Sequence, residues 1–258
     1  MGKVVAIANQ KGGVGKTTTA VNLSSCLALA EKSTLLVDMD PQGNATSGLG
    51  VEKDKLEKSI YDVLIRDLPA REAVVRTELP LLNILPSNIS LVGAEVELVN
   101  LMAREKRLLS ALESVRELFD FILIDSPPSL GLLTINTLTA ADSVLIPIQC
   151  EYYALEGLGQ LLNTIKLVQR NLNTELEVEG VLLTMYDSRL NLAKQVEDET
   201  RKYFGDKVYR TVIRRNVKLS EAPGFGKPII LYDVLSQGAE NYISLAKEVL
   251  NHDQTSIG

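Results

Sequence analysis

Short apolar runs alternate along this chain with longer segments in which apolar residues recur every three or four positions. Each run has the length of a strand that is buried on both faces of a sheet. Alternation of such strands with helices predicts an α/β fold, in which a mainly parallel, twisted sheet carries helices on both faces. The predicted strands are residues 4–8, 34–37, 81–85, 121–124, 143–148 and 178–183, and the predicted helices are residues 16–30, 91–117, 131–140, 154–172 and 190–204.

The pattern favours one folded unit. The chain of 258 residues has no internal repeat and no linker rich in proline, glycine or serine, and its length suits one large α/β domain. We therefore expect a single domain over residues 1–250 and a polar, frayed tail over residues 251–258. In open α/β sheets, ligands bind beyond the carboxyl ends of the strands, which directs attention to the residues that follow each apolar run.

Composition argues against several classes of function. Hydrophobic residues make up 45% and charged residues 23% of the chain, as in folded globular proteins, and no apolar run approaches the ~20 residues that cross a bilayer. Cys26 and Cys150 fall in different predicted elements, which favours buried thiols over a disulfide or a metal pair. The only histidine, His252, lies in the polar tail, so the sequence argues against histidine-based catalysis and zinc chemistry.

A glycine-rich segment directly follows the first predicted strand. Residues 11–18 read Lys-Gly-Gly-Val-Gly-Lys-Thr-Thr, which matches the phosphate-binding pattern GxxxxGKT except that Gln10 replaces its first glycine. Small residues let successive backbone N–H groups surround a phosphate, and a helix that begins at Lys16 adds its positive dipole end. We expect Lys16 to reach the β- and γ-phosphates and the Thr17 hydroxyl to bind Mg²⁺. The sequence therefore predicts a P-loop NTPase-like fold.

Carboxylates follow two other predicted strands. Asp125 ends an apolar strand, as the Mg²⁺-binding aspartate of P-loop enzymes does. Asp40 lies just past the second strand, where it can orient the attacking water or hold Mg²⁺ through a water. Asp38 sits nearer the strand end, and we expect it only to pin the loop. The turn at 125–129 holds two prolines that stiffen it, and it is typical of a switch that senses hydrolysis.

Charge is unevenly distributed. The net charge is −6, which by itself argues against a nucleic-acid binder. The segment from Arg189 to Lys227, however, contains ten lysines and arginines and five acidic residues. This segment therefore has a net charge of +5, and the rest of the chain has −11. Such asymmetry is equally compatible with a basic binding face and with an ordinary solvated surface.

Taken together, the motifs resemble a known family. Residues 11–18 form a deviant Walker A box, which has an extra lysine five residues before the usual one. With Asp38-Met-Asp-Pro-Gln-Gly-Asn-Ala-Thr46 and Asp125-Ser-Pro-Pro128, the chain resembles the ParA/Soj chromosome-partitioning ATPases. The segments 183–189, 216–223 and 226–229 also resemble the Soj-like branch, so the resemblance covers almost the whole chain.

The resemblance implies a mechanism. ATP is held between two subunits of a homodimer, and Lys11 crosses to the partner's phosphates as an arginine finger does. Gly12 lies at the dimer interface, and Asp40 takes the position that activates water. The resemblance thus implies ATP and Mg²⁺ as cofactors. It implies the following site residues: catalytic Lys11, Lys16 and Asp40; nucleotide-binding Lys11, Gly12, Gly13, Val14, Gly15, Lys16, Thr17, Thr18, Met185, Arg214 and Asn216; and Mg²⁺-binding Thr17, Asp40 and Asp125.

Two features of the resemblance bear on specificity. The family usually has proline where Arg214 stands, so the contact of this residue with adenine departs from the pattern; an arginine can stack on the base instead. The family dimer binds double-stranded DNA without sequence preference, and hydrolysis is stimulated by a ParB-type centromere-binding protein. A cytoplasmic, nucleoid-associated protein is therefore implied. The implied DNA-binding residues are Arg189, Lys194, Arg201, Lys218 and Lys227.

Other readings remain open at this stage. A MinD-like membrane-associated ATPase needs a basic amphipathic C-terminal helix, whereas the last apolar stripe here (Tyr242, Leu245, Ala246, Val249) is flanked by more acids than bases. A nitrogenase-reductase-type protein needs two cysteines per subunit for a shared cluster, and Cys26 and Cys150 do not supply that set. A synthetase or kinase needs an acceptor pocket that the sequence does not reveal. A module that only holds ATP would be expected to lack Asp40 or Asp125.

Overall fold

The computed structural model describes residues 2–151 and 156–255. In these residues seven strands form one sheet in the order β3-β4-β2-β5-β1-β6-β7, and every neighbouring pair is parallel except β3 and β4. The predicted mainly parallel sheet is confirmed. The strands are β1 Lys3–Ile7, β2 Thr34–Asp38, β3 Val75–Arg76, β4 Leu82–Leu85, β5 Phe121–Asp125, β6 Ser143–Gln149 and β7 Glu177–Thr184.

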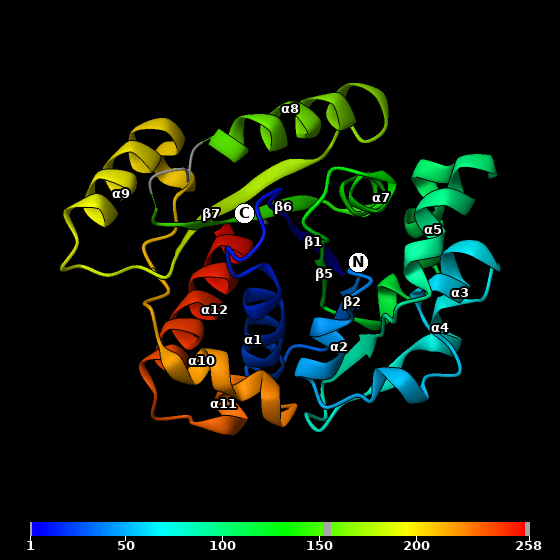
Figure 1. Cartoon of the computed structure of the whole chain (residues 1–258), viewed down its shortest axis with the longest axis horizontal. Coiled ribbons are helices and arrows are strands. Elements are labelled where there is room, and N and C mark those ends of the chain that lie inside the picture. The colour runs from blue at the N-terminus through cyan, green and yellow to red at the C-terminus, as the bar shows by residue number, and fades with distance from the viewer. Residues whose placement is uncertain (1, 152–155, 256–258) are drawn as a thin grey trace.

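Helices connect the strands and cover both faces of the sheet (Figure 1). The α-helices are α1 Lys16–Leu29, α2 Asn44–Gly48, α3 Ile60–Ile65, α4 Ala70–Ala73, α5 Leu91–Glu97, α6 Arg107–Glu113, α7 Leu132–Ala140, α8 Glu156–Asn171, α9 Asn191–Phe204, α10 Val217–Glu221, α11 Ile229–Tyr232 and α12 Gln237–Thr255. The short 3₁₀ helices are η1 Lys53–Lys55, η2 Leu98–Asn100, η3 Arg104–Lys106, η4 Arg116–Leu118, η5 Gly205–Lys207 and η6 Ala222–Phe225.

Alternate strand residues enter two separate cores, because successive side chains of a strand point to opposite faces. Val4 and Ala6 of β1 pack with apolar residues of α3, α5, α6, α7 and α8. Val5 and Ile7 pack on the other face with α1 and α12. Both faces of the central strands are therefore apolar, which explains why the strands appear in the sequence as continuous apolar runs.

One predicted helix is wrong as drawn from the sequence. Residues 91–117 were expected to form a single helix, but the segment divides into α5, η2, η3, α6 and η4. Ala103 has φ 51°, and this left-handed conformation at a non-glycine residue breaks the helical path. The break separates α5 from α6, and both helices pack against α3 and α7.

The C-terminal helix belongs to the core. Tyr242, Leu245, Ala246 and Val249 are 0–3% exposed, and α12 packs along α1. The interpretation that this stripe faces the protein is confirmed. The helix continues to Thr255, so it includes part of the segment 251–258 that we expected to be a tail, and residues 256–258 lie outside the described residues. The predicted start of α8 at residue 154 also lies outside them. Among the described helices, none has the length and apolar character of a membrane span.

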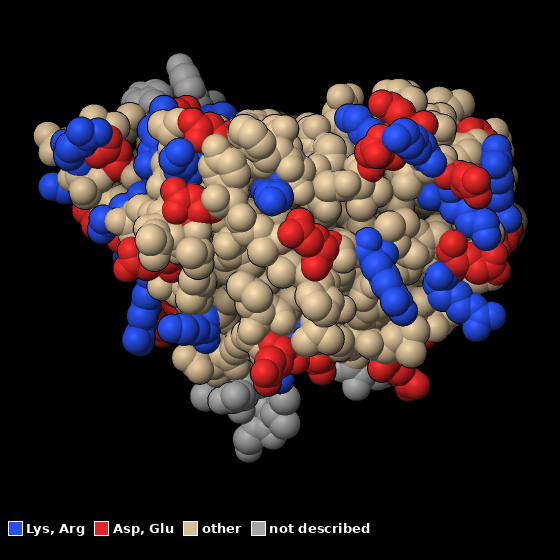
Figure 2. Space-filling model, turned by 90° about the horizontal axis from the view of Figure 1, so that it is seen from below, with Lys and Arg blue, Asp and Glu red and all other residues tan. Residues whose placement is uncertain are grey.

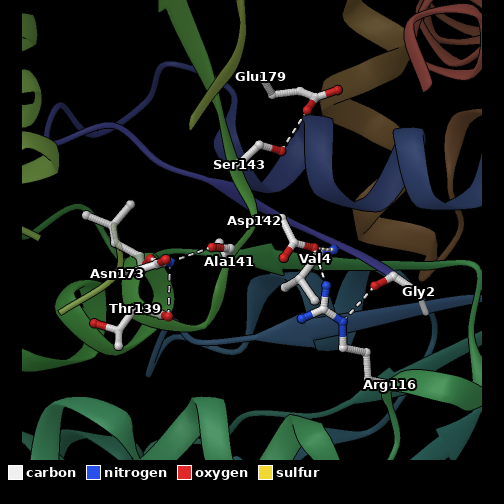
Figure 3. Close-up of polar contacts among 10 residues, drawn as sticks. Gly2, Val4, Arg116, Thr139, Ala141, Asp142, Ser143, Asn173 and Glu179 are labelled. Carbon is white, nitrogen blue, oxygen red and sulfur yellow. Dashed lines mark hydrogen bonds and ion pairs between the residues drawn. The ribbon is translucent and has the colours of Figure 1, made fainter. Parts of the chain in front are cut away.

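A polar network closes the amino edge of the sheet, the edge at which the parallel strands begin (Figure 3). Asp142 accepts hydrogen bonds from the Val4 backbone at 2.8 Å and from the Arg116 guanidinium at 2.6 Å. Glu179 accepts from Lys3 at 2.9 Å and from the Ser143 hydroxyl at 2.6 Å. These bonds join β1, β6 and β7 to the turn before β5, far from the edge where ligands bind in such sheets.

Candidate nucleotide-binding site

The glycine-rich segment forms a loop between β1 and α1 at the carboxyl edge of the sheet. Gly13 and Gly15 have φ of 74° and 87°, a region that other residues rarely adopt, and α1 begins at Lys16 as expected. Val14 is buried, and its carbonyl accepts a hydrogen bond from the Thr184 hydroxyl at 2.9 Å. The backbone is thus shaped for an anion before any ligand binds, with the helix dipole directed at it.

A second brace holds the start of the loop. The Asn9 side-chain amide donates to the carbonyl of Pro147 in β6 at 2.7 Å, and its oxygen accepts from the Lys11 backbone at 3.0 Å. Sequence reasoning missed both Asn9 and Thr184. Their only signal was position, since each is a polar residue at or just past the end of an apolar strand.

The lysine expected at the phosphates is buried. Lys16 is 6% exposed, and its ammonium donates to the carbonyl of Lys11 at 3.0 Å. Burial lowers the pKa of Lys16, while the charges of Asp125 and Asp40 raise it. Because two carboxylates face this single ammonium, the group keeps a positive charge available for a phosphate.

Asp38 pins the neighbouring loop, as expected. Its carboxylate accepts from the backbone and hydroxyl of Thr46 at 2.8 and 2.7 Å and from the Asp40 backbone at 3.1 Å. Thr46 in turn accepts from the Ser87 backbone at 2.9 Å. Burial raises the pKa of Asp38 to about 6, although the hydrogen bonds from Thr46 oppose the shift. Asp38 therefore anchors α2 and the turn after β4 to the end of β2.

Asp125 differs from Asp38 in having almost no partners. It is fully buried, and neither carboxylate oxygen has a hydrogen bond of good geometry to any described residue. Burial and the charge of Asp38 raise the pKa of Asp125 well above its ordinary value, while the nearby Thr17 hydroxyl and the Lys16 ammonium lower it. An unsatisfied buried carboxylate beside a hydroxyl suits Mg²⁺, which prefers oxygen ligands.

Asp40 lies on the same edge in a loop that presents its carboxylate to the site. It is 8% exposed and accepts from the Gln42 backbone at 2.9 Å. Its charge acts on both Lys16 and Asp125. Ser126 follows Asp125, and its buried hydroxyl has no hydrogen-bond partner among the described residues. The structure thus gathers Lys16, Thr17, Asp40 and Asp125 around the P-loop, where the sequence predicts that they meet.

A cavity of about 260 Å³ adjoins the P-loop. It is lined by Gly15 and Thr18 on one side and by Met185, Arg214 and Asn216 on the other, so the three residues expected to hold adenine come together beside the loop. The Arg214 backbone N–H donates to Asn241 at 3.1 Å, a bond that a proline at this position could not make. Asn216 also caps α10 by accepting from the Lys218 backbone at 2.8 Å.

Of the five residues expected to contact DNA, three are exposed and two are partly buried, and three of the five form ion pairs. Arg189 forms two hydrogen bonds to Asp187, Arg201 pairs with Glu197, and Lys218 pairs with Glu221. Lys194 is exposed on α9, whereas Lys227 is partly buried beside α2. On the face in Figure 2, lysines and arginines lie mainly toward the two ends of the molecule and are mixed with acidic residues. This face therefore shows no single unbroken basic patch.

Fold and site together define a P-loop nucleoside triphosphatase, and comparison with known proteins narrows the class. Residues 2–178 match the family described as "AAA domain". The sporulation initiation inhibitor protein Soj of Bacillus subtilis (strain 168) is 64% identical over 249 residues, which are 96% of this chain and 98% of that protein. The chromosome partitioning protein ParA of Myxococcus xanthus is 57% identical, covering 98% of this chain and 89% of that protein. The chain belongs to the ParA/Soj family of chromosome-partitioning ATPases.

Solved structures agree with this fold. A Mycobacterium smegmatis cobyrinic acid a,c-diamide synthase with bound ADP and magnesium has a TM-score of 0.87 and 39% identity, covering 99% of this chain and 97% of that one. The cell division ATPase MinD of Pyrococcus furiosus has a TM-score of 0.78 and 26% identity, covering 97% and 99%. The expected P-loop NTPase-like architecture and the resemblance to ParA/Soj are both confirmed.

Proposed function

We propose that this chain is a partition ATPase that hydrolyses Mg·ATP to ADP and phosphate. Lys16 and the P-loop amides hold the β- and γ-phosphates, and Thr17 and Asp125 hold Mg²⁺, which supplies a positive charge that neutralises developing negative charge on the phosphates. Asp40 orients the attacking water. The adenine lies in the cavity formed by Met185, Arg214 and Asn216. The observation that carries this assignment is Asp125, a buried carboxylate beside the phosphate-binding loop that lacks a hydrogen bond of good geometry to the described residues.

The active form is proposed to be an ATP-dependent homodimer. Gly12 is exposed, its φ lies outside the left-handed region, and a side-chain carbon built on it would meet nothing within 4 Å. No contact with the described residues of its own chain requires glycine at this position. A second subunit that approaches the loop closely, with Lys11 reaching across to its phosphates, would require it. Dimerisation and ATP binding then form one linked equilibrium.

The dimer is proposed to bind double-stranded DNA without sequence preference. The protein is then cytoplasmic and associated with the nucleoid. The ten basic residues of 189–227 support this, because dimerisation doubles a weak basic surface and binding to phosphates grows steeply with the number of contacts. The Arg189 side chain is 87% exposed and pairs with Asp187 of its own loop, so it is available to exchange that partner for a phosphate. A ParB-type DNA-bound protein then stimulates hydrolysis, and ADP formation releases the dimer from DNA.

The Asp40→Ala variant tests this sequence of events. Orienting or activating water contributes about 10²–10⁴-fold to rate, so hydrolysis should fall at least ~100-fold, while ATP binding, dimerisation and DNA binding persist. DNA binding measured without nucleotide, with ADP and with ATP should appear only with ATP and weaken steeply as salt rises. Asp54→Ala, which removes an exposed acid from η1, is the control and should behave as the wild type. Normal hydrolysis by Asp40→Ala would contradict the role assigned to Asp40.

A MinD-like membrane function is the alternative. Binding of the Asp40→Ala variant to DNA and to anionic vesicles distinguishes the two functions. If the ATP-bound variant binds anionic vesicles and no DNA, the membrane reading replaces the partition reading. The burial of the α12 stripe favours DNA, because the apolar residues that would enter a bilayer are already packed on α1.

A further inference from the structure

Glu151 lies between two cations of the nucleotide-binding site. One carboxylate oxygen is 3.9 Å from the Lys11 ammonium, and the other is 3.9 Å from the Arg215 guanidinium. Lys11 belongs to the P-loop, and Arg215 lines the cavity proposed for adenine. A single carboxylate thus joins the two halves of the nucleotide-binding site at the end of β6.

Glu151 follows the end of β6 and is hydrogen-bonded to its last residue, Gln149. The Gln149 side-chain amide donates to the carboxylate at 2.5 Å, and the Glu151 backbone N–H donates to the Gln149 carbonyl at 2.8 Å. The Cys150 backbone donates to the Thr184 carbonyl of β7 at 3.3 Å. The Lys11 backbone is likewise held, since its N–H donates to Asn9 at 3.0 Å. Exchange of the pair therefore requires only that the flexible Lys11 side chain turn to another anion.

We propose that Glu151 is a positioning residue that holds Lys11 within its own subunit and opposes its transfer to a partner subunit. This proposal rests on the proposed function, in which Lys11 reaches the phosphates of a second copy of this chain. Lys11 cannot contact Glu151 of its own subunit and the partner's phosphates at once, so each subunit must break this pair when the ATP-bound dimer forms. The pair thereby sets how much ATP is needed for dimerisation.

The exposure of the three groups suits a contact that is exchanged. The Lys11, Glu151 and Arg215 side chains are 34%, 49% and 67% exposed, so water and salt screen both pairs. Such a contact biases an equilibrium without locking it. Arg215 gives Glu151 a second partner, which prevents the carboxylate from being left without a cation after Lys11 departs.

Glu151→Gln keeps the shape of the side chain and removes its charge. Exposed ion pairs contribute modestly to stability, so loss of the pair in one subunit should raise the dimerisation constant in ATP up to about fivefold. Loss of the pair in both subunits should raise this constant up to about 25-fold at low salt. Light scattering over a series of ATP concentrations measures this change. Because the effect is electrostatic, the difference from wild type should shrink as salt rises to about 0.5 M, whereas a change in packing would persist.

Two controls accompany this variant. Glu52→Gln removes an exposed charge from the Glu52–Lys55 pair of η1, and it should dimerise as the wild type does. Glu151→Asp retains the charge and should restore most of the wild-type behaviour. Thermal melting of all three variants should match the wild type, so that differences in dimerisation report the site.

The outcomes separate this proposal from the proposed function. If the wild type dimerises with ATP but Glu151→Gln needs as much ATP or more, the positioning role is overturned while the partition function stands. If the gain is the same at low and high salt, the role is not electrostatic and the proposal is overturned. If the wild type fails to dimerise with ATP, the dimer mechanism itself is overturned, and the role of Glu151 is overturned with it.

Discussion

The two edges of the sheet carry the same types of polar residue, but these residues differ in how many hydrogen bonds they form. At the amino edge, Asp142 and Glu179 each accept two hydrogen bonds, and the Asn173 amide donates to the carbonyls of Leu138, Thr139 and Ala141 at 2.7–3.2 Å (Figure 3). At the carboxyl edge, Asp125 is more deeply buried than Asp142, yet its carboxylate lacks a hydrogen bond of good geometry to the described residues.

This difference distinguishes structural from functional polar groups. Buried polar groups are usually satisfied by their own chain, and an unsatisfied one reduces stability unless something else binds it. The amino edge completes its own contacts and so stabilises the fold. In the proposed function, the carboxyl edge leaves contacts for Mg·ATP to complete, so stability that is lost in folding would be regained on binding. Asp38 shows that position alone does not decide, because it lies at the carboxyl edge and is fully satisfied.

Replacing the buried lysine should show the largest difference between the two edges. Lys16→Ala removes an ammonium on which both Asp40 and Asp125 act, and we expect ATP affinity to fall ~100-fold because bonds to charged groups are strong. Lys3→Ala at the amino edge removes a lysine that pairs with Glu179, and it should leave ATP affinity unchanged. Calorimetric titration of both variants with ATP measures the contrast.

An equal loss of ATP affinity in both lysine variants would contradict the division of labour between the edges. It would indicate that the amino edge controls the site through global stability. Thermal unfolding of each variant, measured without nucleotide, would then show a matching loss in Lys3→Ala.

Much of the architecture was predictable from the sequence because both faces of the sheet are covered. The six predicted strands all exist, with ends within one residue of the prediction, since continuous apolar runs bounded by polar residues leave little ambiguity. The antiparallel edge strand Val75–Arg76 was missed because two residues carry no periodic pattern. The break at Ala103 was missed because an alanine gives no signal of left-handed backbone.

The site residues that directly follow strands could be predicted from the sequence. The contacts between residues far apart in the sequence could not. The P-loop, Asp40 and Asp125 each follow the end of a strand in the sequence, and the carboxyl ends of parallel strands share one edge of the sheet, so their meeting could be predicted. The brace from Asn9 to Pro147 and the contact of Glu151 with Lys11 join residues about 140 positions apart. No periodicity specifies such pairs, because they depend on the order of strands in the sheet.

The same change of aspartate to asparagine should affect stability in opposite directions at the two edges. Asp125→Asn removes an unsatisfied buried charge, so the nucleotide-free protein should gain about 1–2 kcal/mol of unfolding free energy at pH 7, while Mg²⁺-dependent ATP affinity falls. Asp142→Asn removes the charge that pairs with Arg116, so it should lose about 1 kcal/mol and keep its affinity for Mg·ATP. Chemical denaturation and ATP titration of both variants test the pair.

The pH dependence supplies the control for Asp125. Because the pKa of Asp125 is raised in the folded protein, the charged form costs stability progressively as pH rises from the ordinary value of 3.8 through the raised value. The advantage of Asp125→Asn should therefore be largest at high pH and shrink as pH falls toward 3.8. An advantage that stayed constant over this range would show that it arises from packing and not from the charge.

The smallest contrast concerns two buried serines. Ser143 donates its hydroxyl to Glu179 at 2.6 Å, whereas the Ser126 hydroxyl has no hydrogen-bond partner among the described residues. Ser143→Ala should therefore lose about 1 kcal/mol of unfolding free energy, while Ser126→Ala should stay within about 0.5 kcal/mol of the wild type because no bond is lost. If the Ser126 hydroxyl serves the ligand, only Ser126→Ala should slow ATP hydrolysis, and steady-state rates compared with denaturation curves would separate the two effects. Equal losses of stability would show that Ser126 is a structural residue. Ser126 would then no longer count with Asp125 as an unsatisfied group at the carboxyl edge.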